Sequence, residues 1–448
     1  MTLGPAQPVT VEALRAEVAP FAATDPIAFF GAARARGGFA FFWASPHNEL
    51  TLAAAGTVLA LRPSGQDRFE QAAGAWRRHA ENILLEGPRV PATGPLLLGG
   101  FAFDAVPHDP AWQPLGDALL ILPQALLTAT REGTWLTTTG PDAAELSAAV
   151  DLARDLSCQS RALPPEPTSG TWQQLDVPSA REWTESVRGI VQGLAAGDSG
   201  LRKLVLARQC QLHREQPANP MAALRRLTAA YPDTYRFAIS LDDTCFLGAT
   251  PERLAELSAG RVRATSLAGT FRRGTTEEED AALGTALLAN PKERQEHRIV
   301  VEALIEGLTK AGVRLDTIPL EPELLKLGNV QHLCTPLSGG ASGASLLELA
   351  GRLHPSPAVG GSPRELALQA MRRLEPFDRG WYAGPVGWVD RFGEGELTVG
   401  IRSCLLRGCE ARLYAGCGLV AASNPEAEFQ ESGLKLRPML AALDALPR

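Results

Sequence analysis

A lysine and a glutamate near predicted strands are the residues best suited to acid–base chemistry. Lys203 lies in the apolar run 201–207, which predicts a strand, and it shares one strand face with Val205 and Ala207. The small side chains on that face leave room where burial would disfavour an ammonium group, and a neutral lysine can act as a base. Glu252 comes directly after a second predicted strand, where a rigid scaffold can present a carboxylate. The alternative for both residues is a charged side chain exposed to water.

Two helices that begin in the same way carry further acidic residues. Asn290 and Asn424 are predicted N-caps, and each is followed by a proline at the first helical position. The charged residues are spaced three or four apart on one face of each helix: Glu293 and Glu296 on the first, and Glu428, Glu431 and Lys435 on the second. Carboxylates suit Mg²⁺, which needs one or two of them because it keeps several waters. We therefore predict Glu296 and Glu431 as its ligands, and a solvated face with an internal ion pair is the alternative for the second helix.

Cationic and glycine residues add features that suit an anionic ligand. Arg402 lies inside a strand predicted at 396–404, and together with Lys435 it could hold carboxylates near a metal. Gly269 would let a backbone amide approach a ligand closely. With a base and an acid, this set indicates a small substrate that carries more than one carboxylate and undergoes proton transfer on both sides.

Composition excludes several classes of partner. The net charge of −7 over 448 residues argues against a nucleic-acid surface. No run of about 18 apolar residues occurs, so we expect no membrane span. The N-terminus lacks the pattern of a signal peptide, and the seven cysteines are scattered, which fits a reducing compartment. We therefore expect a cytoplasmic protein.

The order of the predicted elements favours an α+β sandwich, because strands and inserted helices follow no regular βαβ alternation. The segment 161–175 begins with a run rich in Pro, Ser and Thr and predicts a linker or exposed loop. It would divide an N-terminal part of the sandwich, 1–160, from a catalytic region, 176–448. Helical patterns in the N-terminal part include 9–18 and 25–35.

Nine segments within about residues 180–440 resemble the chorismate-utilising enzymes, a family that includes isochorismate, salicylate, anthranilate and aminodeoxychorismate synthases. The segments are KLVLAR at 203–208, GATPERL at 248–254, LAGTFRRG at 267–274, NPKERQEH at 290–297, QHLCTP at 331–336, LHPSPAVGG at 353–361, IRSC at 401–404, YAGCGLV at 414–420 and ASNPEAEFQESGLK at 422–435. Residues 1–160 resemble the family only loosely, at 97–104. The resemblance implies a large α+β sandwich whose antiparallel-rich sheets surround a central cleft, with helices outside.

The resemblance also implies roles for individual residues. Glu296 and Glu431 would hold Mg²⁺, which binds the ring carboxylate of chorismate, and Glu293 and Glu428 would lie behind them. Arg402 resembles the arginine that binds the enolpyruvyl carboxylate. The expected substrate contacts are Ala268, Gly269, Thr270, His332, Tyr382, Arg402, Gly416 and Lys435.

Two positions separate the reactions of the family. Lys203 is similar to the lysine that activates water in the water-using members, and anthranilate synthases lack it. Ala268 stands where aminodeoxychorismate synthases have a nucleophilic lysine. The resemblance therefore implies a reversible, Mg²⁺-dependent conversion of chorismate to isochorismate. In this reaction Lys203 takes a proton from the water that attacks C2, and Glu252 donates one to the leaving C4 hydroxyl.

Other members of the family stay open as alternatives. Salicylate synthase forms isochorismate and then eliminates pyruvate, with the same lysine, glutamate and metal ligands. A non-catalytic chorismate-binding subunit is a further alternative, against which the presence of Lys203 and Glu252 argues. We expect no glutaminase partner and a monomer or homodimer. The sequence does not decide between menaquinone and siderophore biosynthesis.

Overall fold

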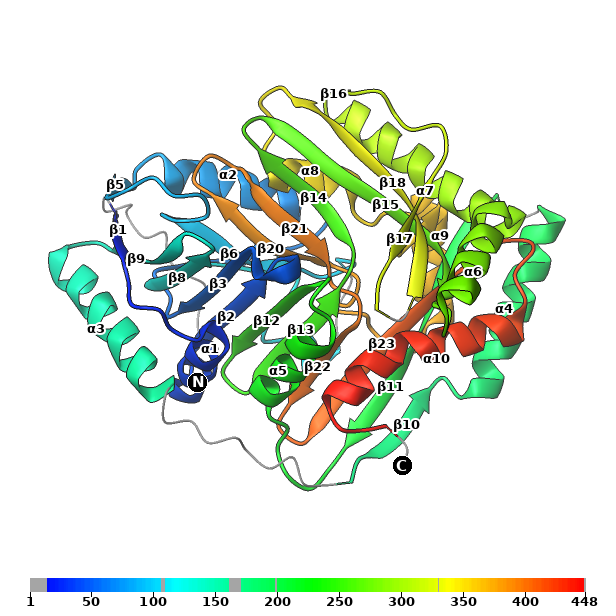
Figure 1. The fold of residues 1–448 in the computed structure, drawn as a ribbon, viewed down its shortest axis with the longest axis horizontal. Helices are drawn as coiled ribbons and strands as arrows, with labels where there is room; N and C mark the ends of the chain where they lie inside the picture. Colours follow the sequence, from blue (N-terminus) through cyan, green and yellow to red (C-terminus); the bar gives the residue numbers. More distant parts are fainter. Residues whose placement is uncertain (1–13, 106–108, 161–170, 198–199, 329, 447–448) are drawn as a thin grey trace.

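Two large sheets face each other in the computed structural model, which describes residues 14–105, 109–160, 171–197, 200–328 and 330–446 (Figure 1). In spatial order, the first sheet contains β10 (Gln173–Val177), β11 (Lys203–His213), β23 (Glu410–Leu419), β22 (Ser403–Arg407), β13 (Thr244–Thr250), β12 (Tyr235–Leu241), β2 (Phe39–Ala44), β3 (Leu50–Ala55), β8 (Ala125–Thr130), β9 (Gly133–Gly140), β1 (Arg15–Pro20) and β5 (Leu84–Glu86), with β19 (Gly361–Ser362) beside β11. The second contains β16 (Val313–Leu315), β18 (Val330–Ala341), β15 (Arg261–Arg272), β14 (Arg253–Ser258), β21 (Gly395–Val399), β20 (Pro385–Asp390), β6 (Leu96–Phe101), β7 (Ala118–Leu122) and β4 (Leu59–Leu61), with β17 (Glu323–Lys326) beside β18. Among the described pairings only β1–β5 is parallel.

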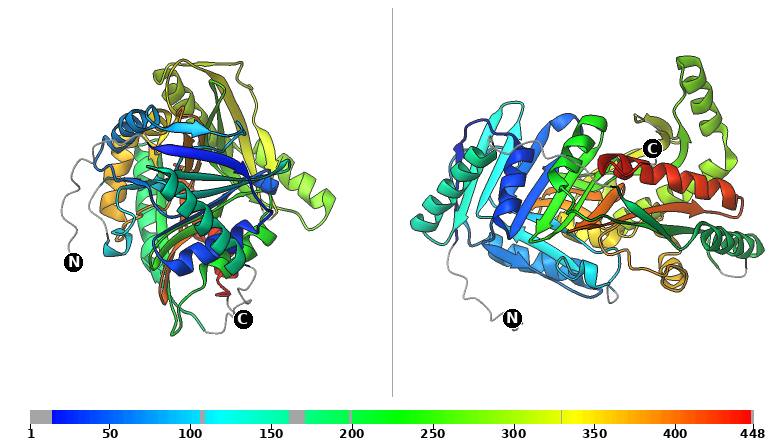
Figure 2. Two further views of the ribbon diagram at one scale, coloured as in Figure 1. Left: turned by 90° about the vertical axis from the view of Figure 1, so that its left-hand side faces the viewer. Right: turned by 90° about the horizontal axis from the view of Figure 1, so that it is seen from below.

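Helices cover the sandwich on both sides. A row of helices packs on the first sheet and is visible along one face in Figure 2: α3 (Ala143–Ser160), α1 (Pro26–Arg36), α5 (Pro220–Ala230), α10 (Pro425–Ala442) and α4 (Ala180–Ala196). Others belong to the second sheet or its ends: α2 (Arg68–Ala80), α6 (Glu277–Ala289), α7 (Pro291–Lys310) and α8 (Leu346–Leu353). Helix α9 (Arg364–Leu374) lies against β11 and β19 of the first sheet. Short 3-10 turns occur at Pro46–Asn48 and Pro110–Trp112. None of the described helices is long and apolar enough to cross a membrane.

The strand β2 shows why this sequence forms a covered sandwich. Every one of its six residues is buried. Phe41 and Trp43 face the core between the sheets, where Trp43 meets Trp388 of β20 edge-on at 6.4 Å. Phe42, one position along, packs beneath the row of helices. A strand covered on both faces needs apolar residues at successive positions, and alternate residues point to opposite sides. The predicted α+β sandwich with antiparallel-rich sheets is therefore confirmed.

The N-terminal and C-terminal parts of the chain share both sheets. β2 pairs with β12 in the first sheet, and β6 pairs with β20 in the second. Residues 161–170 of the predicted linker lie outside the described residues, and its last residues belong to β10, which pairs with β11. Both parts thus contribute neighbouring strands to one sandwich.

Two local predictions were wrong. The helix predicted at 9–18 is a strand where the structure describes it, since β1 alternates the buried Ala16 and Val18 with exposed residues and pairs with β9. The strand predicted at 396–404 is two strands, because β21 ends in the second sheet and β22 begins in the first. Arg402 lies at this crossing with a φ of 51°, rather than inside a strand. The chain passes from one sheet to the other there, which the alternation of polar and apolar residues in this segment does not reveal.

Candidate active site

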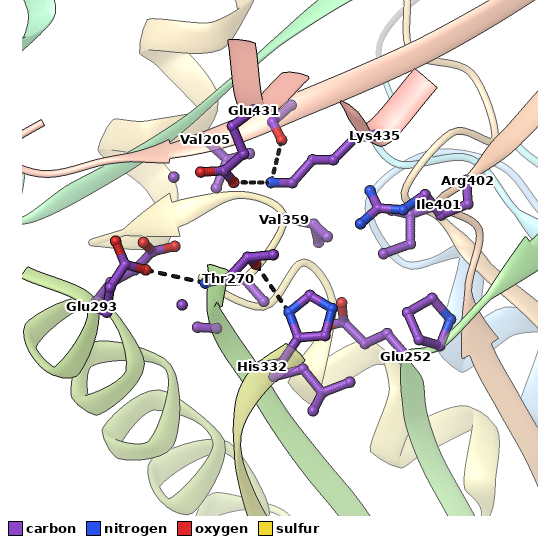
Figure 3. A pocket seen from close by; sticks show the side chains of 18 of the residues that line it. Val205, Glu252, Thr270, Glu293, His332, Val359, Ile401, Arg402, Glu431 and Lys435 are labelled. Atoms are coloured by element: carbon purple, nitrogen blue, oxygen red, sulfur yellow. Dashed lines mark hydrogen bonds and ion pairs between the residues drawn. The ribbon is translucent and has the colours of Figure 1, made fainter. Parts of the chain in front are cut away.

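A cavity lies between the two sheets, next to β11 and the first turns of α7 and α10 (Figure 3). It is lined by Val205, Pro251, Glu252, Leu267, Ala268, Gly269, Thr270, Glu293, Glu296, His332, Ala358, Val359, Tyr382, Ile401, Arg402, Gly416, Gly418, Glu431 and Lys435. The structure therefore brings all of the predicted substrate contacts together with the predicted acid and both predicted metal ligands. Lys203 and Glu428 are the predicted site residues that do not line this cavity.

Glu252 supplies a carboxyl group that can hold a proton at neutral pH. It follows the end of β13 at the second position, and its side chain is buried. Burial raises the pKa of Glu252 to about 7, even though the positive charges of Lys203, Arg402 and Lys435 favour the ionised form. A carboxylic acid with this pKa is suited to donate a proton to a leaving group.

Lys203 is fully buried and pairs with a carboxylate that lines the cavity. Its Nζ lies 2.9 Å from Oε1 of Glu296, on the second turn of α7. Gly418 of β23 makes this approach possible: a Cβ there would lie 2.2 Å from Glu296 Oε1 and 2.8 Å from Lys203 Cε. The predicted base and the predicted metal ligand are therefore direct partners, which the sequence did not indicate.

Glu431 and Lys435 form a second ion pair, one turn apart on α10. Lys435 Nζ lies 2.7 Å from Glu431 Oε1 and donates to the backbone oxygen of Gly416 at 3.0 Å. Burial opposes both charges, but Lys435 lowers the pKa of Glu431 and Glu431 raises that of Lys435. Both groups therefore stay ionised. The internal ion pair belonged to the alternative given for this helix, but both side chains line the cavity and do not form a solvated face.

A third lysine holds the two outer carboxylates. Lys292 Nζ lies 2.7 Å from Glu428 Oε1 and 3.3 Å from Glu293 Oε1. The other oxygen of Glu293 accepts a hydrogen bond from the backbone nitrogen of Thr270 at 3.1 Å. Burial raises the pKa values of Glu293 and Glu428, whereas Lys292 lowers them. Lys292 thus offsets negative charge directly behind the cavity.

The carboxylates on the second turns of α7 and α10 suit a hard cation. Glu296 and Glu431 both present carboxylates to the cavity, and hard divalent ions prefer oxygen ligands. Within the described ranges, the ligand atoms of Cys417, Glu428 and Glu431 lie within 4.8 Å of one another. Cys417 lies within hydrogen-bond distance of the Glu428 backbone oxygen through its thiol, and burial raises its pKa well above normal, so oxygen atoms remain the available donors.

His332 adds a neutral imidazole to the wall of the cavity. Its Nδ1 is 2.9 Å from the hydroxyl of Thr270. Burial lowers the pKa of His332 to about 3, and Nε2 has no hydrogen-bond partner in the described part of the chain.

A β-bulge separates Ala268 from Thr270, and Gly269 adopts a φ of 76° there, as glycine readily does. The bulge turns the Thr270 amide toward Glu293.

Arg402 and Tyr382 also line the cavity, and Figure 3 shows Arg402 on the side away from Glu293. Figure 3 shows the Arg402 guanidinium pointing into the space that Lys435 enters from above. Among the described residues, Arg402 has no carboxylate within salt-bridge distance. Tyr382 stacks on Tyr414 at 5.1 Å and 17°, so its ring forms a fixed wall. The two cations make this side suitable for the carboxylates of a ligand.

Comparison with known proteins identifies the family. A family model for chorismate binding enzymes matches residues 7–444. The chain belongs to this family. The salicylate biosynthesis isochorismate synthase of Pseudomonas aeruginosa is 39% identical over 433 residues, which cover 94% of this chain and 88% of that protein. The isochorismate synthase MenF of Bacillus subtilis is 34% identical over 434 residues, which cover 94% of this chain and 91% of that protein. The structure of the menaquinone-specific isochorismate synthase MenF from Escherichia coli has a TM-score of 0.81 at 27% identity, covering 97% of this chain and 95% of that one.

The cavity of this chorismate-binding enzyme is also lined or flanked by residues that the sequence reasoning did not select. Lys292 is the charged one, and it lies inside the segment NPKERQEH. The others are apolar or small and shape the cavity: Val205, Pro251, Leu267, Ala358, Val359, Ile401 and Gly418. All of them fall inside the nine segments that carried the family resemblance, so those segments were the available signal.

Proposed function

We propose that this chain is a Mg²⁺-dependent isochorismate synthase, which converts chorismate reversibly to isochorismate. The observation that carries the proposal is that one cavity is lined both by a readily protonated Glu252 and by Glu296, the carboxylate that contacts the buried Lys203. Glu252 lies across the cavity from Glu293 (Figure 3), and Lys203 pairs with Glu296, one turn along α7 from Glu293. The names of the Pseudomonas and Bacillus relatives support the same reaction.

The cations of the cavity fit a dicarboxylate substrate. Arg402 and Lys435 would hold the carboxylates of chorismate, since charge-assisted hydrogen bonds of this kind are short and strong. The Tyr382 ring and the apolar Val205, Val359 and Ile401 would surround the ring and exclude bulk water.

Glu296 and Glu431 are the residues that we propose to hold Mg²⁺. Their oxygen donors suit the ion, and Lys292 offsets the charge of Glu293 and Glu428 behind them. When bound, the ion would supply positive charge that fixes the ring carboxylate of the substrate. Glu296 contacts Lys203 through Oε1 and retains a second oxygen for such a ligand.

The proton transfers follow from the positions of the base and the acid. Lys203, as a neutral amine, would take a proton from the water that forms the new bond to C2. Both ring double bonds shift by one position, the C4–O bond breaks, and Glu252 gives its proton to the leaving hydroxyl, which departs as water. One water enters and one leaves, so the reaction is balanced and reversible.

Product analysis with purified protein, chorismate and MgCl₂ tests the proposal. We expect isochorismate and chorismate to reach the same ratio from either side, and no aromatic amine when ammonium salts replace other salts. Stoichiometric salicylate and pyruvate would instead identify a salicylate synthase. Anthranilate would contradict the assignment of Lys203 to water activation, and chorismate binding without turnover would identify a non-catalytic subunit.

A further inference from the structure

One edge of β11 has a gap that begins two residues after Lys203. On that edge β19 pairs with Lys203 and Leu204, and β10 pairs with residues 209–213. Between these two strands, no described strand pairs with this edge. Backbone groups of a buried strand need hydrogen-bond partners, so the gap must be satisfied in another way.

The side chains of Glu375 and Arg379 fill the centre of the gap. At its two ends, the backbone oxygen of Gly360 accepts from the Val205 nitrogen at 2.7 Å, and Trp183 Nε1 donates to the Ala207 oxygen at 3.3 Å. Arg379 Nη2 donates to the backbone oxygen of Val205 at 2.8 Å, and the backbone nitrogen of Ala207 donates to Glu375 Oε1 at 2.8 Å. Arg379 Nε also donates to Glu375 Oε2 at 2.8 Å. The two side chains are only 4% and 5% exposed, so this ion pair takes the place of a neighbouring strand inside the protein.

Arg379 also joins β11 to two other walls of the cavity. Its Nη1 donates to the backbone oxygen of Val359 at 2.8 Å. Its own backbone oxygen accepts from the nitrogen of Tyr382 at 2.9 Å, and its guanidinium lies 4.4 Å from the ring centre of Phe103. Val205, Val359 and Tyr382 all line the cavity, so one arginine connects three segments that must keep their places around a substrate.

We propose that Glu375 and Arg379 are positioning residues, which hold the β11 backbone beside Lys203 in register with the Val359 and Tyr382 walls. The planar guanidinium matches three acceptors at once, and a lysine at this position could not reach all of them. The kinetic part of this inference rests on the proposed function, and the structural part does not.

Arg379→Lys and Glu375→Gln test the proposal. For Arg379→Lys we expect kcat to fall about tenfold or more, since small displacements of reacting groups are costly, while KM for chorismate changes little because Arg402 and Lys435 are untouched. Glu375→Gln keeps an oxygen that can accept from Ala207, so it should retain more activity than Glu375→Ala. Arg372→Lys is the matched control, since Arg372 lies in the last turn of the preceding helix α9 and pairs with Asp104 at a partly exposed site.

Hydrogen exchange measures the positioning without any substrate. In Arg379→Lys and Glu375→Gln, amides in the peptide 203–208 should exchange about tenfold faster, with the other strands of the first sheet unchanged. The proposal is overturned if both exchange and kcat stay at wild-type values, if kcat falls only in proportion to the unfolded fraction, or if Arg372→Lys has the same effects. If the wild-type protein does not convert chorismate, the proposed function fails, and hydrogen exchange still decides whether the ion pair holds β11.

Discussion

Glu252 is the residue whose protonation should shape the pH dependence of activity. Its pKa is raised to about 7 by burial, and a general acid must carry its proton. The active fraction therefore falls as the pH rises through this value. We expect kcat/KM for chorismate to decline above about pH 7, with a limit of tenfold per pH unit.

The variant Glu252→Gln assigns that decline to one side chain. The amide has nearly the same shape but no acidic proton, so kcat should fall about 10²–10⁴-fold, as is typical when a general acid is lost. The residual activity should show no decline centred near pH 7. An unchanged decline in this variant would mean that another group titrates there. Chorismate affinity, measured by titration calorimetry, should change little.

The role of Lys203 as a base is tested with a variant that preserves a hydrogen bond to Glu296. Lys203→Gln can still donate a hydrogen bond to that carboxylate but cannot take a proton from water. We expect kcat to fall about 10²–10⁴-fold while chorismate still binds, because Arg402 and Lys435 remain. Lys310→Gln, which removes an exposed ion pair with Glu306, is the control and should be active. Normal turnover by Lys203→Gln would give the lysine a structural role only.

At the scale of single elements, the close contact of β23 with α7 depends on one glycine. A Cβ at Gly418 would overlap Glu296 Oε1, so Gly418→Ala should force Glu296 and Lys203 apart. We expect most activity to be lost in a protein that still folds. Gly189→Ala on α4 is the matched control: among the described residues, no neighbouring side chain lies within 4 Å of the point that its Cβ would occupy, and alanine in a helix is favoured by about 0.5–1 kcal/mol. Kinetics and thermal unfolding of the two variants separate these outcomes.

The starts of α7 and α10 were predictable because they depend on capping residues that are neighbours in the sequence. Asn290 accepts from the backbone of Glu293, and Asn424 accepts from that of Ala427, as their positions before proline predicted. The position of Arg402 was not predictable, because it depends on the chain leaving one sheet for the other. The role of Glu375 and Arg379 was not predictable either, because their hydrogen bonds to β11 depend on which strands pair with that strand.

At the scale of the whole molecule, the cavity depends on both sheets. Helix α10 packs on β23 of the first sheet, and α7 packs on β15 of the second. The resemblance to a family indicated which residues meet, but local patterns could not show that Lys203 and Glu296 pair across this junction. The N-terminal part, which resembles the family only loosely, supplies β2 and β6 to the same two sheets. Removing it would expose the edges of β12 and β20.

Because the proposed metal ligands come from α7 and α10, Mg²⁺ should connect the two layers of the sandwich. A ligand that binds only the folded state stabilises it by about 2.7 kcal/mol at a hundredfold excess over its Kd. We therefore expect MgCl₂ to raise the unfolding temperature in the absence of chorismate, and chelation to reverse the effect and abolish turnover.

The variant Glu431→Gln removes one charged ligand, so in this variant the shift in unfolding temperature should be largely lost. Glu426→Gln alters an exposed glutamate of the same helix that pairs with Arg188, and it should retain the wild-type shift. An equal shift in Glu431→Gln and in the wild type, or full activity in chelator, would show that Mg²⁺ does not bind at this junction.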